Sequence, residues 1–119
     1  MEHVEIILSV IKEQVKLYLL DAGEFFPFGT YIDRRGDIKP FSAFLEHRND
    51  QPSSLELIGL LESYIDKNLS YIIAAIAIDV TIKENGESVD AVEVRFFEGN
   101  RAYTKHLKYV IQTNDVKFF

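Results

Sequence analysis

The fold is decided by a meander that reads YIIAAIAIDVTIKENGESVDAVEVRFFEGNRAYTKHLKYVI from residue 71 to residue 111. Three apolar or alternating segments, 71–83, 88–98 and 101–111, are separated by Asn85-Gly86 and Gly99-Asn100, which are strong signals for tight hairpin turns. No helix fits between these segments, so the strands they predict must pair antiparallel. A short further strand is expected over 116–119.

Upstream of the meander, the sequence predicts two amphipathic helices and one more hairpin. Apolar residues recur at helical spacing over 4–20 and again over 57–69. Between them, segments 25–33 and 38–46 are rich in aromatic and β-branched residues and flank a turn centred on Arg35-Gly36. The expected order is α-β-β-α-β-β-β(-β). We therefore predict a single α+β domain over 1–119, an antiparallel sheet of five or six strands with two helices packed on one face.

Composition narrows the classes of partner. The 119 residues include 19 acidic and 13 basic side chains, which gives a formal charge of −6. Binding to nucleic acid or to an anionic membrane needs clustered Lys and Arg, so we expect neither. The longest uncharged apolar stretch, 69–78, is too short to span a bilayer. With no Cys in the chain, a reducing compartment is permitted, and the cytoplasm is the expected location.

Burial is the argument for the register of the first meander hairpin. A two-residue loop at Asn85-Gly86 would place Ile78 opposite Glu93, which puts a carboxylate beside the most apolar strand. A three-residue loop centred on Gly86 places Ile78 opposite Val94 instead. We predict this second register, in which the even-numbered residues of 72–82 face the helices.

This register predicts a row of chemistry-bearing side chains across three strands of the outer sheet face. Asp79, Glu93 and His106 would be neighbours, with Arg95 in the adjacent row. Two carboxylates and an imidazole could bind a divalent metal or transfer a proton. The alternative is a solvated outer face on which these charges neutralise one another.

The same register predicts an apolar patch on that outer face. Ile73, Ala75, Ala77 and Phe97 would lie together, with Arg95 beside them, and such a patch suits a flat partner. We expect it to bind a protein partner or a second copy of the chain. The other possibility is coverage by the chain itself, either by the C-terminal tail at 118–119 or by the polar loop 47–54.

An aromatic segment around Pro27 is the third candidate site. Phe26 and Phe28 could line a pocket, and Gly29 would let a ligand approach the backbone closely. The other interpretation is a strand entry that fills the core.

The segments 23–29, 33–36 and 76–80 together resemble a group of small uncharacterised bacterial proteins. Those proteins pair an aromatic-Pro-Phe-Gly segment with a C-terminal meander. The resemblance implies a bacterial, cytosolic origin and carries no function.

Sequence motifs for catalysis are absent: there is no phosphate-binding glycine loop, nucleophile elbow, His-Glu-x-x-His or calcium loop. We therefore expect no cofactor and a non-enzymatic protein-interaction module. An immunity-type or regulatory protein that masks a basic partner would fit the acidic composition. The alternative is an enzyme, or a small-ligand or metal binder, that uses Asp79, Glu93 and His106.

Overall fold

The computed structural model describes residues 2–42, 53–68 and 70–119. These residues form two helices, α1 (Glu2–Ala22) and α2 (Ser54–Asn68), and six strands. The strands are β1 (Phe28–Asp33), β2 (Ile38–Phe41), β3 (Tyr71–Glu84), β4 (Glu87–Glu98), β5 (Arg101–Gln112) and β6 (Asp115–Phe118). The predicted α+β class and element order are confirmed. The predicted continuation of β2 over residues 43–46 lies outside the described residues.

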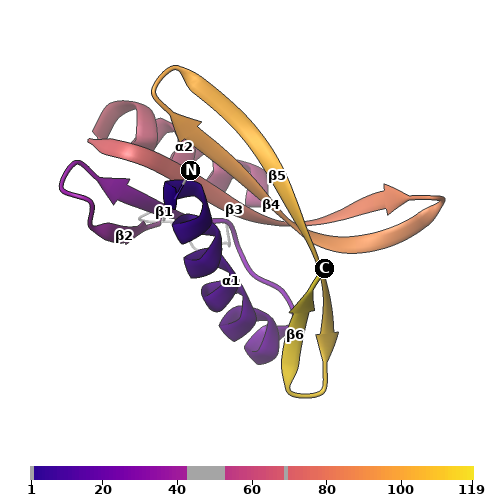
Figure 1. Cartoon of the computed structure of the whole chain (residues 1–119). Coiled ribbons are helices and arrows are strands. Elements are labelled where there is room, and N and C mark those ends of the chain that lie inside the picture. The colour runs from indigo at the N-terminus through magenta and orange to yellow at the C-terminus, as the bar shows by residue number, and fades with distance from the viewer. Residues whose placement is uncertain (1, 43–52, 69) are drawn as a thin grey trace, which may run out of the picture.

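The strands form one antiparallel sheet in the order β2-β1-β3-β4-β5-β6. Strand β5 pairs with β4 from Arg101 to Lys108 and then pairs with β6 from Tyr109 to Gln112. Figure 1 shows the result: the β3–β4 hairpin and the β5–β6 hairpin diverge at one end of the sheet. In the described part of the chain, neither helix is long and apolar enough to cross a bilayer.

Local sequence signals set the helix ends. Gly23, with a positive φ of 78°, follows the last residue of α1 and donates its backbone N–H to the Leu19 carbonyl at 2.8 Å. Ser53 precedes α2, and its Oγ accepts the backbone N–H of Glu56 at 3.1 Å. Gly23 thus caps the end of α1, and Ser53 caps the start of α2.

The two helices cover opposite faces of the sheet, so the prediction that both pack on one face is wrong. Helix α1 packs through Ile11 on Ala75 and Val94, and this side is called the α1 face. Helix α2 packs through Leu61 on Ile76, on the α2 face. In Figure 1, α1 lies in front of the sheet and α2 behind it. The cause is β3, which is apolar on both faces and needs cover on both. The sheet-facing side of the two helices is buried at Ile7, Ile11, Val15, Leu57, Leu61 and Ile65.

The register of the β3–β4 hairpin also differs from the prediction. Asn85 and Gly86 both have positive φ, 52° and 80°, as in the two-residue turn that matches the natural twist of a hairpin. Ile78 therefore lies opposite Glu93. The two-residue turn is compatible with this pairing because the Glu93 carboxylate is not left without partners: Arg95 and His106 both contact it.

Candidate interaction surface

Glu93 is the centre of a polar network on the α2 face. It lies directly opposite His106 in the β4–β5 pair, as predicted. The His106 Nε2 atom lies 3.2 Å from Glu93 Oε1. Glu93 is the more enclosed of the two, with a side chain 20% exposed against 40% for His106.

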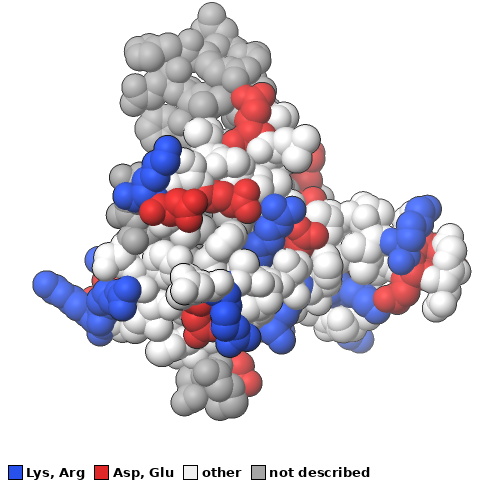
Figure 2. Space-filling model, turned by 90° about the horizontal axis from the view of Figure 1, so that it is seen from above, with Lys and Arg blue, Asp and Glu red and all other residues white. Residues whose placement is uncertain are grey.

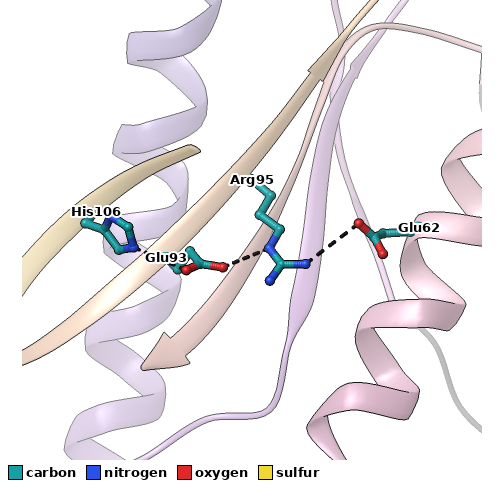
Figure 3. A network of polar contacts seen from close by, with 4 residues as sticks. All are labelled: Glu62, Glu93, Arg95 and His106. Carbon is teal, nitrogen blue, oxygen red and sulfur yellow. Dashed lines mark hydrogen bonds and ion pairs between the residues drawn. The ribbon is translucent and has the colours of Figure 1, made fainter. Parts of the chain in front are cut away.

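Arg95 extends this network toward α2. Its Nε donates to Glu93 Oε2 at 2.8 Å, and its Nη1 lies 3.8 Å from Oε2 of Glu62 on the helix. Figure 3 shows the four side chains in a line from β5 across β4 to α2. The network thus joins three elements. Sequence reasoning missed Glu62, because only the docking of α2 determines which helix residue meets Arg95.

Asp79 does not belong to this row. The observed register places it opposite Val92, on the α1 face, where the Tyr109 hydroxyl donates to its Oδ1 at 2.7 Å. The predicted row of Asp79, Glu93 and His106 is therefore wrong, because the two-residue turn shifts β3 by one position and reverses its faces. Within the described ranges, no group of three His, Asp or Glu residues is placed to hold a metal ion.

The electrostatics of Glu93 favour a permanently charged carboxylate. Burial is the largest influence and acts to raise the pKa of Glu93, but the hydrogen bonds from Arg95 and His106 together outweigh it and lower that pKa. Asp79 is the opposite case, because burial raises its pKa despite the hydrogen bond from Tyr109. Glu93 is thus a weak base that fixes two neighbouring side chains in place.

The predicted apolar patch does not exist. Ile73, Ala75 and Ala77 are fully buried on the α1 face, beneath α1. Phe97 lies on the α2 face and packs partly buried against the cluster beneath α2. The same one-position shift explains the error. Of the predicted binding residues, Arg95 and Phe97 share a face, and the other three lie on the opposite one.

The aromatic segment contributes to the core through two of its three predicted residues. Phe28 is buried and meets Tyr18 edge-on, with ring centroids 5.3 Å apart. Gly29 is covered by the Phe41 ring, so the chain itself makes the close approach that the glycine allows. Phe26 is 57% exposed. These three residues therefore do not face one common pocket.

Helix α2 covers only half of its face. On β3, Ala74, Ile76 and Ile78 are buried beneath it. On the same face the β4 residues are partly buried and the β5 residues are exposed. We call the accessible polar and small residues of this region the open strip: Arg95, Ala102, Thr104 and His106. The β4–β5 pairing holds the backbone of the strip, and Glu93 holds the side chains of Arg95 and His106.

Strand β5 also carries a concentration of positive charge. Its first eight residues, Arg101–Lys108, include three basic side chains and no acidic one, although the chain as a whole carries −6. The Arg101 guanidinium stacks on the Tyr103 ring at 5.3 Å, and Lys108 pairs with Glu84. Lys105 is exposed, and no ion pair joins it to a described carboxylate.

A groove of about 380 Å³ between α1 and β6 is the other surface feature with several cations. Lys16 pairs with Asp115 at 3.7 Å, and the Lys12 ammonium lies 5.6 Å from the centre of the Phe118 ring. These two lysines join α1 to β6. The groove therefore lies between two elements of the same chain whose side chains already pair with one another.

The face seen in Figure 2 carries Lys and Arg interspersed with Asp and Glu, without one large field of either sign. Comparison with known proteins adds no assignment: no family model, curated protein or solved structure matches the chain. The open strip and the adjoining edge of β5 are therefore the candidate interaction surface of this protein.

Proposed function

We propose that this protein is a non-enzymatic protein-interaction module that binds its partner through the open strip and the adjoining edge of β5. One observation carries the proposal: Glu93 holds Arg95 and His106 in fixed positions on a part of the sheet that α2 leaves uncovered. Side chains ordered before binding lose little conformational entropy when a partner arrives, and this favours recognition.

The chemistry of the site supports binding rather than catalysis. The pKa of Glu93 is lowered, and its carboxylate is hydrogen-bonded to a guanidinium and an imidazole. A carboxylate that acts as a general base at neutral pH needs a raised pKa instead. With Asp79 on the other face, Glu93 and His106 provide two potential metal ligands. A regulatory role, in which the module masks a surface of its partner, is consistent with a small domain that binds through the open strip.

The test is capture of partners from cells of the source organism by the full chain and by two matched variants. Thr104→Arg places a bulky cation in the open strip, at an exposed position where it does not disturb the core. Gln112→Arg makes the same kind of change at an exposed position of the same strand, beyond the strip. We expect a partner that both the parent and Gln112→Arg retain and that Thr104→Arg loses. Equal retention by all three proteins would contradict the proposal.

A further inference from the structure

We infer that the outer edge of β5, from Ala102 to Leu107, binds an acidic, extended segment of a partner protein as an added strand. This inference rests on the proposed function and specifies the chemistry of the partner. It depends on three observations: unpaired backbone groups along the edge, a defined length, and a local charge that admits acidic segments and opposes a second copy of β5.

The backbone groups on this edge follow from the hairpin geometry. Glu98 and Arg101 close the two-residue turn at Gly99-Asn100 and form a hydrogen-bonded pair. Odd-numbered residues of β5 therefore direct their N–H and C=O groups toward β4, and even-numbered residues direct theirs outward. The Lys108 carbonyl confirms this alternation, since it accepts the backbone N–H of Phe119 at 3.0 Å on the β6 side.

Three even-numbered residues have no strand partner on that side. Among the described residues, β6 pairs with β5 only from Tyr109 onward, so the outward N–H and C=O groups of Ala102, Thr104 and His106 meet no other strand. An exposed row of this kind is a template for an incoming strand. The row ends where β6 begins, which leaves room for a segment of roughly 20 Å.

Two unpaired edges of the sheet, one on β2 and one on β5, differ in how they are protected. The opposite edge, β2, is a strand of 4 residues that contains Pro40, and short edge strands with Pro resist further pairing. The β5 edge is longer and has no Pro, and its cations are its protection. A second copy of β5 would place six basic side chains around one strand pair, because each Arg101–Lys108 segment brings three.

An acidic segment meets the opposite situation. On the α1 face it would lie beside Lys105, which has no ion pair with a described carboxylate, and beside the partly buried Tyr103 and Leu107. On the α2 face it would lie beside Thr104 and His106. Carboxylates interspersed with apolar residues therefore fit this edge, and the charge of Arg101–Lys108 attracts them although the whole chain is acidic.

The experiment uses the full chain and a fluorescently labelled peptide in which Glu and Val alternate, with binding measured by anisotropy. Thr104→Pro removes one outward N–H and leaves the β4 ladder intact, while Thr104→Val removes the hydroxyl and keeps the N–H. We expect Thr104→Val to bind like the parent and Thr104→Pro to bind about tenfold more weakly. Lys105→Glu should weaken binding as well, and the matching Lys-Val peptide should not bind.

Changes in the peptide keep the test independent of how the variants fold. Two further Glu-Val peptides carry methyl groups on alternate backbone nitrogens, one on all the Glu nitrogens and the other on all the Val nitrogens. Only every second N–H of an added strand faces β5, so one of these two peptides should lose binding and the other should keep it. Binding that is insensitive to both methylation patterns and to Thr104→Pro would overturn strand addition, yet leave a side-chain contact with the open strip possible. The inference would also be overturned if the Glu-Val peptide did not bind, or if the parent formed a tight dimer that Thr104→Pro lost. The proposed function is tested separately by the capture experiment.

Discussion

Replacement of Gly29 by Ala is expected to disturb one aromatic contact in the β1–β2 hairpin. Gly29 lies directly opposite Phe41 in that hairpin, and the Phe41 ring lies over the glycine. A Cβ atom at position 29 would come within 2.2–2.6 Å of three ring carbons, closer than any real contact. The ring cannot move freely, because it also stacks on Tyr64 with 5.8 Å between centroids and meets Tyr31.

The magnitude follows from two opposing effects. Forcing an extra methyl group into a packed site costs about 1–3 kcal/mol. The lower entropy of the unfolded chain returns about 0.5–1 kcal/mol when Gly becomes Ala in a strand. We therefore expect Gly29→Ala to lower the free energy of unfolding by roughly 1–2 kcal/mol.

We would measure unfolding in urea by far-UV circular dichroism. Tryptophan fluorescence cannot be used because the chain contains no Trp. A second variant, Phe41→Leu, removes the aromatic ring. The loss of unfolding free energy in the double variant should be smaller than the sum of the two single losses by about 0.5 kcal/mol or more. Strict additivity, or a Gly29→Ala protein as stable as the parent, would refute the idea that the ring occupies the space above Gly29.

Four further outcomes are expected. Ile11→Ala should lower the free energy of unfolding by about 2–5 kcal/mol in urea denaturation, because Ile11 is fully buried between α1 and the sheet; a change below about 0.5 kcal/mol would mean that another face of α1 is buried. Gly86→Ala should cost about 1–2 kcal/mol in the same assay, since the turn requires its positive φ, and an unchanged midpoint would argue against the two-residue turn. Glu93 has a lowered pKa in the fold, so its contribution to stability is complete above its ordinary pKa of 4.5 and is lost as the pH falls through the lowered value; Glu93→Gln should remove this acid-side loss from a pH series of denaturation curves. Asp79 has a raised pKa, because burial outweighs the hydrogen bonds from Tyr109 and from the Phe25 backbone, so the folded state gains stability as the pH falls through that raised value; Asp79→Asn should show less of this gain in a pH series of denaturation curves, and a gain as large as the parent's would contradict the assignment.

Local signals in the sequence were sufficient for the elements and their order. Gly23 and Ser53 mark helix ends through backbone geometry and side-chain capping, which depend on few neighbours. The Gly99-Asn100 turn likewise fixed the pairing of Glu93 with His106. These features could be predicted because each is determined within a few residues of the chain.

The positions of the helices and of Asp79 depended on a choice between two rules. Burial favours a three-residue turn and the Asn85-Gly86 sequence favours a two-residue turn, and the structure adopts the two-residue turn. The uninterrupted apolar run from Ile72 to Ile78 contained the missing signal, since a strand covered on one face only would alternate. Glu62, by contrast, could not be placed before the docking of α2 was known.

The contact between α1 and β6 has a consequence for how the chain folds during synthesis. Helix α1 leaves the ribosome well before Val116, which belongs to the core on which that helix packs. Until β6 has also emerged, the apolar side of α1 stays exposed to chaperones and to neighbouring nascent chains. Pairings this distant in sequence close slowly, so we expect folding that begins late and proceeds as one cooperative event.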